Sequence, residues 1–470
     1  MLTTHRQSFN RHLIHVFHGK SAANLIVDTV LTDAKAYVGN RVVGCCIAID
    51  NGRIFRIAKE PNMPRAERKI NLKSRLVLPG LIDAHVHLRD ERKAYKEDFY
   101  SGTAAAAAGG FATVLDMPNN DPVTMSAKAL QNRMKIAQSR ILTNVGFFSE
   151  FPKDLKEIEH IVGEGAVAFK LYMAEQIGGL NISEDDAILA AFKILSKVSV
   201  PVAVHAEDKN LLETAKRKLT SAGRNGVDAF VEAHSEDVEA KAVERLLGIA
   251  KRAGTRVHFC HISSRKGLHT IRAAKSSGMP VTCETTPHNL LLSVDDLAET
   301  GSVALTVPPV RDKKQIEALW AGARNGSIDI IASDHAAHTL AEKKTRNVWE
   351  AKTGIPGLET TLPLLLTEVK RGRLSIAKLV RLMSEKPAEI FGLKDRGSLK
   401  EGNPADMTVV DLDIENEIDS SEFRSKAKYS PFNGWKVTGK AVKTFVCGQL
   451  VMDEGQIVAN AGSGHLIRRA

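Results

Sequence analysis

The chain has 470 residues, of which 43% are hydrophobic and 26% are charged, and its formal net charge is +10. This length excludes the usual single small domain and predicts a large buried core with a smaller second domain. Lysine and arginine are interspersed with acidic residues, so the positive charge favours small anionic substrates over a nucleic-acid-binding surface.

The five cysteines are odd in number and widely scattered, which argues against a disulfide framework and predicts a reducing, cytoplasmic location. No apolar segment approaches the roughly 20 residues that span a bilayer, so no membrane association is expected. Residues 1–22 contain basic residues and no acidic one, and we expect a disordered basic tail. The alternative interpretation is a transit peptide, which this segment resembles only weakly.

Short strands are expected within residues 23–78, with a turn at Asn51-Gly52. From Leu81 onward, apolar strands alternate with helical segments, as in repeated βα units. Eight strands are predicted, at 81–87, 112–119, 144–150, 166–173, 200–207, 256–263, 281–288 and 328–335. The helical segments between them include 101–109, 125–139, 184–197, 237–253, 265–277 and 312–324.

Eight βα units in about 250 residues are the number found in a (β/α)8 TIM barrel. After about residue 395 the strand pattern returns, for example at 407–411 and 442–446. We therefore expect an α/β fold with a barrel at 79–395 and a small β-sandwich domain made from both chain ends, residues 23–78 and 396–470.

Ligand-type residues recur at the predicted C-terminal ends of the strands, where active sites of this fold lie. His85 and His87 are two residues apart and share one face of the first strand, so their imidazoles could hold one divalent ion. Alone, such a pair could merely cap a strand. His205, His261 and Asp334 end later strands, and this recurrence predicts a metal site.

Lys170 ends the fourth strand, where its ammonium group would repel a metal ion. The small residues Ala166 and Ala168 share its face, so its side chain is expected to point into the barrel mouth. Reaction with carbon dioxide would convert it into an anionic carbamate able to bridge two metals. The alternatives are a salt bridge and a surface lysine, and the residues alone leave them open.

Several motifs together carry a resemblance that spans about residues 23–450. They include Asp-Ala-His-Val-His-Leu-Arg at 83–89, Met-Pro-Asn at 117–119, Phe-Lys-Leu-Tyr at 169–172, Cys-His-Ile-Ser at 260–263, Ser-Asp-His-Ala-Ala-His at 333–338 and Gly-Ile-Pro-Gly-Leu-Glu at 354–359. With these motifs the chain resembles the cyclic amidohydrolases of the amidohydrolase superfamily, and the dihydroorotases most closely. The resemblance implies reversible closure of N-carbamoyl-L-aspartate to dihydroorotate, in pyrimidine biosynthesis.

The resemblance also implies the cofactors, which are two zinc ions and carboxylation of Lys170. His85, His87 and Asp334 would hold one ion, His205 and His261 the other, and the carbamate would bridge them with a hydroxide. A divalent metal lowers the pKa of its bound water to about 7. Asp334 would take the proton and pass it to the departing ring nitrogen.

The implied substrate contacts are His87, Arg89, Asn119, Val307, His338 and Gly354. Of these, Arg89, Asn119 and His338 would bind the ring carboxylate, and we call them the carboxylate clamp. A surface ion pair, a turn residue and a loop histidine are the alternative interpretations of these three.

Four positions depart from the family pattern. Asp90-Glu91 stands where Pro-Gly is usual, Asn289 stands for a histidine, Val307 for a polar residue and Ala337 for a proline. The first departure predicts a less rigid and more acidic loop. Val307 retains only its backbone for a contact to the ring.

Two other functions compete with dihydroorotase. A hydantoinase or allantoinase would cut an uncharged ring and should lack the carboxylate clamp. A non-catalytic barrel that supports a partner such as aspartate transcarbamoylase should have lost ligands, and this chain keeps all six. A homodimer and an aspartate transcarbamoylase complex are both left open as assemblies.

Overall fold

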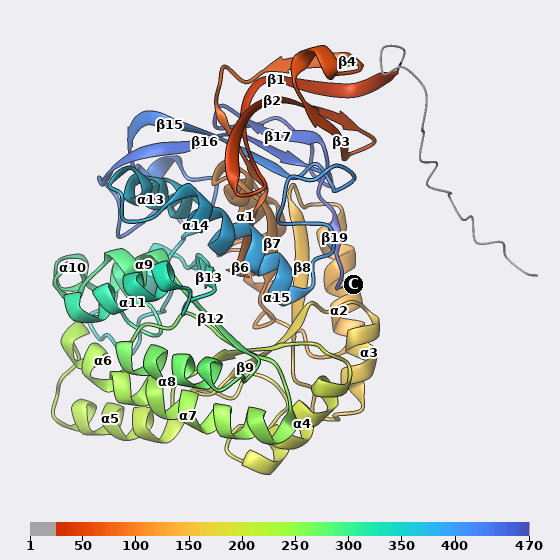
Figure 1. Ribbon diagram of the computed structural model, residues 1–470. Coiled ribbons are helices and arrows are strands. Elements are labelled where there is room, and N and C mark those ends of the chain that lie inside the picture. The colour runs from red at the N-terminus through yellow and green to blue at the C-terminus, as the bar shows by residue number, and fades with distance from the viewer. Residues whose placement is uncertain (1–24, 470) are drawn as a thin grey trace, which may run out of the picture.

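A closed ring of parallel strands forms the larger part of the computed structural model, which describes residues 25–469 (Figure 1). Strands that follow one another in the chain pair in parallel and in order from β6 to β13. The strands are β6 (Leu81–His87), β7 (Phe111–Asp116), β8 (Asn144–Glu150), β9 (Ala168–Tyr172), β10 (Val202–His205), β11 (Val257–Phe259), β12 (Val281–Thr285) and β13 (Ile330–Ile331). All eight predicted barrel strands are thus present.

The eighth strand differs from the continuous segment 328–335 that the sequence predicts. β13 pairs with β12, and a separate strand, β14 (His335–Ala336), pairs with β6 and closes the ring. Asp334 lies in the gap with a φ of 47°, which an extended strand cannot accommodate. The break therefore turns this carboxylate away from the ladder.

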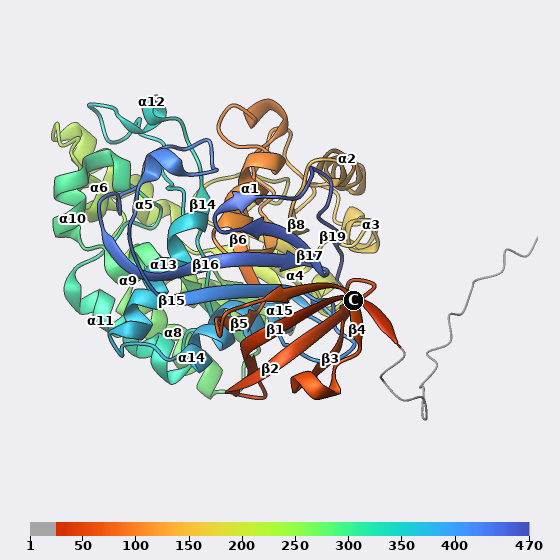
Figure 2. The ribbon, with the colours of Figure 1, turned by 90° about the horizontal axis from the view of Figure 1, so that it is seen from above.

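Helices surround the barrel strands (Figures 1 and 2). The six predicted helices correspond to α1 (Phe99–Ala108), α2 (Ala127–Gln138), α4 (Asp185–Lys197), α7 (Glu236–Ala253), α8 (Arg265–Ser276) and α11 (Lys313–Asn325). Further helices are α3 (Glu157–Gly163), α5 (Lys209–Ser221), α6 (Val227–Ala233), α9 (Pro287–Leu291), α10 (Val294–Thr300), α12 (Leu340–Lys343), α13 (Leu358–Lys370), α14 (Ile376–Val380) and α15 (Lys386–Phe391). None of the helices in residues 25–469 is long and apolar enough to cross a membrane.

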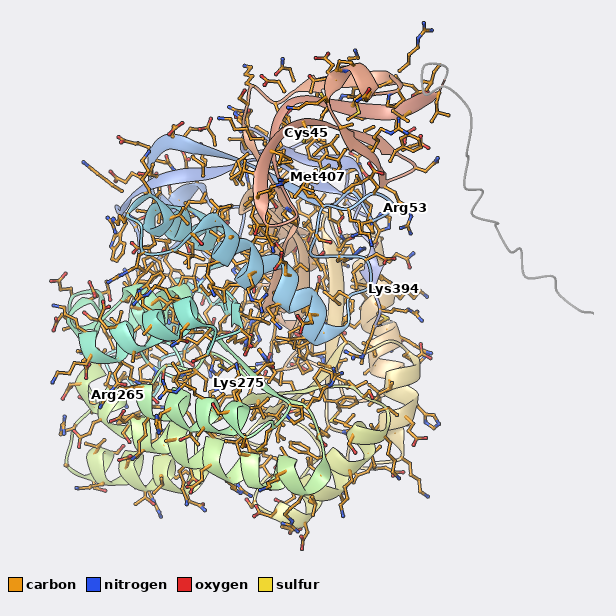
Figure 3. All side chains as sticks on the ribbon, viewed as in Figure 1. Cys45, Arg53, Arg265, Lys275, Lys394 and Met407 are labelled. Carbon is orange, nitrogen blue, oxygen red and sulfur yellow. The ribbon has the colours of Figure 1, made fainter. Side chains whose placement is uncertain are left out.

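Local sequence explains where these helices begin and end. The side chains of Ser126 and Ser264 accept backbone N–H groups in the first turns of α2 and α8. Gly254 and Gly326 follow α7 and α11 with φ values of 69° and 86°, a conformation that glycine adopts without steric cost. Charged side chains such as Arg265 and Lys275 extend from α8 on the outside of the barrel (Figure 3).

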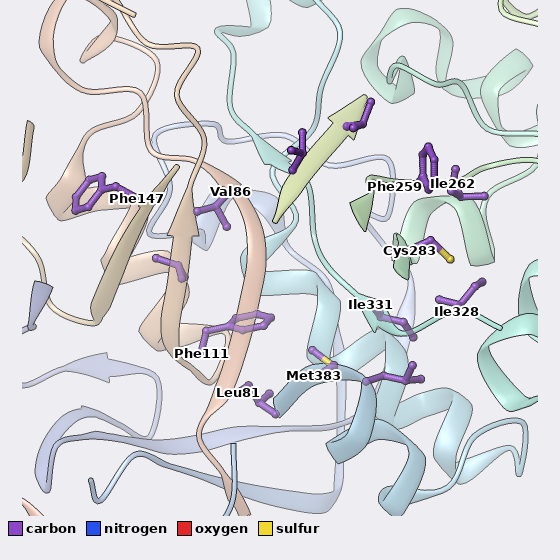
Figure 4. Packing of buried hydrophobic residues seen from close by; sticks show 14 of the residues in the cluster. Leu81, Val86, Phe111, Phe147, Phe259, Ile262, Cys283, Ile328, Ile331 and Met383 are labelled. Atoms are coloured by element: carbon purple, nitrogen blue, oxygen red, sulfur yellow. The ribbon is translucent and has the colours of Figure 1, made fainter. Parts of the chain in front are cut away.

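One hydrophobic cluster joins the strands to the helices around them (Figure 4). It includes Leu81 and Val86 of β6, Phe111 of β7, Phe147 of β8 and Phe259 of β11, all buried. A second cluster fills the base of the barrel, where Phe391 and Ile467 pack against strand residues. The base is thus closed, and only the opposite ends of the strands are left to form a site.

Both chain ends build one β domain, as expected (Figure 2). The first end supplies β1 (Ile26–Val38), β2 (Arg41–Asp50), β3 (Arg53–Ala58), β4 (Arg65–Asn71) and β5 (Leu76–Pro79). The second supplies β15 (Met407–Glu417), β16 (Lys436–Val446), β17 (Gln449–Asp453) and β18 (Gln456–Ile457). Antiparallel pairing of β5 with β15 joins the two halves, and β4 and β5 pair with successive stretches of β1. The predicted fold class is confirmed.

The predicted domain boundaries at 78/79 and 395/396 stay predictions, and the predicted basic tail at 1–22 lies outside the described residues. Two C-terminal segments reach the barrel itself. β19 (Leu466–Ile467) pairs in parallel with β8, and Ser425 binds Glu97 through its hydroxyl group. Residues far along the chain therefore support the barrel at both its ends.

Candidate active site

A cavity of about 200 Å³ lies at the C-terminal ends of the barrel strands. Its lining includes His85, His87, Arg89, Asn119, Tyr172, His205, His261, Val307, Asp334 and Gly354. A larger cavity of about 540 Å³ lies between α13 and the β15–β16 region, and its lining contains no histidine. The smaller cavity is therefore the candidate active site.

His85, His87 and Asp334 converge on one point of this cavity. Oδ1 of Asp334 lies 3.4 Å from Nε2 of His85 and 3.3 Å from Nε2 of His87. The potential ligand atoms of the three side chains all lie within 4.8 Å of one another, and the three residues are buried. This is the first group of ligands that the sequence predicts.

The other nitrogen of each histidine is held by an acceptor. Nδ1 of His85 lies 2.5 Å from Glu284, and Nδ1 of His87 lies 2.7 Å from Oδ1 of Asn119. Both rings therefore donate from Nδ1 and turn the lone pair of Nε2 toward Asp334. Burial lowers the pKa of His87 to about 3, so its imidazole is neutral, the form that binds metal.

A second pair of histidines lies beside this group. Nδ1 of His205 and Nε2 of His261 are 3.1 Å apart, and the His261 ring lies 5.3 Å from that of His85. Nε2 of His205 lies 2.8 Å from Glu207, which also contacts His234 at 2.7 Å. Glu207 thus holds the far side of His205 and leaves Nδ1 facing His261.

Lys170 lies beneath the cavity and is fully buried. Its Nζ lies 3.4 Å from Nε2 of His85 and 3.0 Å from the sulfur of Cys260. Among residues 25–469, no carboxylate lies within 4.0 Å of this nitrogen. A buried ammonium without an anion is costly, and this one lies beside His85 of the first group.

Arg89 lines the cavity and is 95% buried, yet no carboxylate lies within 4.0 Å of it in the described part of the chain. One of its nitrogens lies 3.3 Å from Nε2 of His338, whose Nδ1 lies 3.1 Å from Lys96. Burial, together with the charges of Arg89 and Lys96, lowers the pKa of His338 to about 2. Arg89 is therefore a buried cation beside a neutral imidazole.

Only two of the three residues of the carboxylate clamp line the cavity. Arg89 and Asn119 line the cavity, whereas His338 is not among the lining residues and contacts Arg89 from behind. Asn119 also orients His87, a contact that the sequence did not predict.

Val307 and Gly354 form part of the cavity wall. Gly354 has a φ of 128°, and a Cβ atom there would come within 2.8 Å of the carbonyl oxygen of Ala336. Its N–H donates to Leu305, and its carbonyl accepts from Lys343 at 2.9 Å. The hydroxyl group of Tyr429 donates to the same carbonyl at 3.5 Å, so this oxygen already has two donors within the protein.

Four residues of this region were missed by sequence reasoning. Glu284 and Glu207 orient His85 and His205, and Lys343 donates to the carbonyl of Gly354 in the cavity wall. Tyr172 lines the cavity with a buried hydroxyl that has no hydrogen-bond partner among residues 25–469. A signal existed for the two glutamates, because each is an acidic residue at the end of a buried strand.

Comparison with known proteins places the chain in a family. The Amidohydrolase family matches residues 76–451. An L-hydantoinase of Paenarthrobacter aurescens is 33% identical over 449 residues, covering 94% of this chain and 98% of the relative. A dihydroorotase of Methanothermobacter thermautotrophicus is 38% identical over 416 residues, covering 88% and 93%.

A solved structure shows the same relationship. The L-hydantoinase (dihydropyrimidinase) from Arthrobacter aurescens superposes with a TM-score of 0.91 at 32% identity, covering 94% of this chain and 100% of that one. The predicted family, enzyme class and metal dependence are in accord with these matches. The chain belongs to the amidohydrolase family, among its cyclic amidohydrolases, which are metal-dependent hydrolases.

Proposed function

We propose that the chain is a dihydroorotase, which interconverts N-carbamoyl-L-aspartate and dihydroorotate in pyrimidine biosynthesis. The observation that carries the proposal is the buried, unpaired guanidinium of Arg89 in the wall of the cavity. Dihydroorotate has a ring carboxylate, whereas hydantoin, dihydrouracil and allantoin do not. A substrate carboxylate would supply the anion that this cation lacks.

His338 supports the same substrate. A neutral imidazole accepts a hydrogen bond at only one nitrogen, yet both of its nitrogens face cationic donors, Arg89 and Lys96. The carboxylate of Glu342 lies 3.8 Å from Nδ1 of His338, which is too far for a hydrogen bond. A substrate carboxylate bound at Arg89 would accept hydrogen bonds from the guanidinium and lie close to His338.

The donor set fits two zinc ions. His85, His87 and Asp334 would hold one ion, and His205 with His261 the other. In the first group, acceptors bind the Nδ1 atoms of both histidines, so the lone pairs of the Nε2 atoms face the cavity. Carboxylation of Lys170 would replace its unpaired ammonium by an anion placed between the groups. When bound, the ions supply an activated water at neutral pH and polarise the amide carbonyl.

Asp334 is the catalytic residue of this proposal. Burial alone would raise the pKa of this carboxyl, but His85, His87 and His261 hold it well below its usual range. Asp334 is therefore ionised and can accept a proton from the attacking water and deliver it to the ring nitrogen that departs. In the reverse direction it takes the proton from the carbamoyl nitrogen as the ring closes.

A hydantoinase is the second candidate, and the 33% identity to the L-hydantoinase over 94% of the chain favours it. Such an enzyme acts on an uncharged ring and has no use for a buried Arg89. The non-catalytic alternative is disfavoured because the ligand side chains lie together in one cavity. The homodimer and the aspartate transcarbamoylase complex stay predictions. The five cysteines are free thiols, which supports the proposed cytoplasmic location.

The deciding experiment compares two reactions of purified, metal-analysed protein. Cyclisation of N-carbamoyl-L-aspartate and hydrolysis of hydantoin are measured at equal enzyme concentration. We expect two zinc ions per chain and the higher kcat/KM on the anionic substrate. Activity on hydantoin alone would overturn the proposal in favour of the second candidate.

A further inference from the structure

The turn that carries Arg89 has an unusual backbone. Arg89, Asp90 and Glu91 have φ values of 56°, 56° and 50°, so three consecutive residues other than glycine are in the left-handed region. Such conformations persist only where surrounding contacts hold them, and they occur at functional sites. The contacts that hold this turn can be named.

Asp90 ties the turn to two helices. Its buried carboxylate lies 3.1 Å, through each oxygen, from the guanidinium of Arg140, which follows α2. The same carboxylate accepts the N–H of Phe99, the first residue of α1, at 3.0 Å, and the N–H of Glu91 at 2.6 Å. The N–H of Asp90 in turn donates to the carbonyl of Glu97 at 2.9 Å.

A network of ion pairs and hydrogen bonds centred on Arg133 holds both ends of the turn. Arg133 of α2 lies 2.8 Å from the carboxylate of Glu91 and 2.7 Å from that of Asp116, at the end of β7. The other oxygen of Asp116 accepts the N–H of Leu88 at 2.8 Å. The residues before and after Arg89 are therefore both anchored to the second βα unit.

The guanidinium of Arg89 itself is not anchored by any carboxylate in the described residues, and its one side-chain hydrogen bond there is with His338. Its place in the cavity therefore depends on the backbone of the turn. A proline at position 90 is excluded, because its ring fixes φ near −65° and Asp90 has a φ of 56°. Ion pairs of Asp90 and Glu91, and not a proline ring, therefore hold the backbone of this turn.

We propose that Asp90 and Arg140 are positioning residues, which hold the turn so that Arg89 faces the substrate carboxylate. The inference rests on the proposed function and deepens it, because it makes recognition of the anionic substrate depend on residues outside the cavity. Arg140 is the better test, because its side chain is half-exposed and its loss leaves no cavity in the core.

The test is the steady-state kinetics of the holoenzyme with N-carbamoyl-L-aspartate. Arg140→Met should raise KM about tenfold and change kcat less than about twofold, because the binding contact moves while the reacting groups do not. Arg140→Lys, which keeps the charge, should restore most of the loss. Arg92→Met removes an exposed ion pair with Asp121 in the same loop and serves as the matched control, with KM unchanged.

Hydrogen exchange gives a readout independent of turnover. The amides of residues 88–94 should exchange faster in Arg140→Met and Asp90→Asn than in the wild type, and not in Arg92→Met. If the wild type is active and Arg140→Met has the same KM, the inference is wrong but the proposed function stands. The same holds if Arg140→Met loses kcat without a rise in KM. A wild type inactive on this substrate overturns the proposed function and the inference with it.

Discussion

The Nδ1 atom of His85 lies 2.5 Å from Oε1 of Glu284, and both side chains are buried. The other oxygen of Glu284 lies 3.1 Å from Nε2 of His258. Burial would raise the pKa of Glu284, but the two imidazoles hold it well below its usual range. A fixed anion therefore orients the imidazole of His85 from the side opposite the cavity.

Replacement of Glu284 by glutamine should lower zinc affinity by about 10–100-fold, the usual effect of losing such a partner. A glutamine has one acceptor oxygen, so it cannot accept from both histidines. Metal retained after dialysis against a graded chelator series measures the effect. Glu239→Gln is the control, because Glu239 is a buried carboxylate that binds Ser263 and Ser264 instead of histidine. Equal retention in both variants would contradict the proposed orienting role.

Asp334→Ala should lower kcat by about 10²–10⁴-fold or more, because the variant loses its proton carrier. The fold should persist, since the side chain faces the cavity and not the hydrophobic clusters. Circular dichroism and metal analysis accompany the assay, so that loss of a ligand is separated from loss of the base. Activity near that of the wild type would refute the role of Asp334.

Arg89→Met should weaken apparent binding of the anionic substrate by about 1.5–3 kcal/mol or more, the scale of a hydrogen bond to a charged group. Arg89→Lys should recover part of this loss, because lysine keeps the charge but not the planar fork. Any activity on hydantoin should be unaffected by either change, and it provides the internal comparison. An unchanged KM for N-carbamoyl-L-aspartate would remove the main support for the carboxylate clamp.

Lys343 should make folding stability depend on pH in the alkaline range. It is fully buried and donates to the carbonyls of Leu305 and Gly354, and burial lowers its pKa from 10.5 to about 7. Between about pH 7 and 10.5 the unfolded chain binds a proton here that the folded chain does not, so stability rises with pH.

Urea unfolding at pH 7 and pH 9.5 checks the Lys343 prediction. The free energy of unfolding of the wild type, relative to that of Lys343→Met, should be larger at the higher pH. Lys344→Met serves as the matched control, because Lys344 is its exposed neighbour. A wild-type difference that stays flat between the two pH values would show that Lys343 is charged throughout.

The barrel and the order of the potential ligand residues along it were predictable from local sequence pattern. Apolar strands and amphipathic helices alternate with different periods, and each ligand follows a strand directly, so counting strands also ordered the ligands. Short helices such as α9 and α10 escaped prediction because five to seven residues carry too little periodicity. The break between β13 and β14 escaped because the left-handed conformation of Asp334 depends on its surroundings.

The loop after Arg89 shows the limit of motif comparison. The departure at Asp90-Glu91 predicts a less rigid loop, because neither residue restricts the backbone as proline does. The structure pairs them with Arg140 and Arg133, which lie 50 and 42 residues away along the chain. The two acidic residues, which predict a less rigid loop in the sequence, form ion pairs that hold the loop in the fold.

The sequence by itself determined which potential ligand residues follow the barrel strands and in what order, because this depends only on residue type and on position at strand ends. Only the tertiary structure decided which nitrogen of each histidine faces the cavity and which cation has no anionic partner among residues 25–469. The reason is that the acceptor for His85 lies 199 residues further along the chain, and the contact of Arg89 with His338 spans 249 residues. Ring orientation and charge pairing are set by neighbours that the folded barrel brings together.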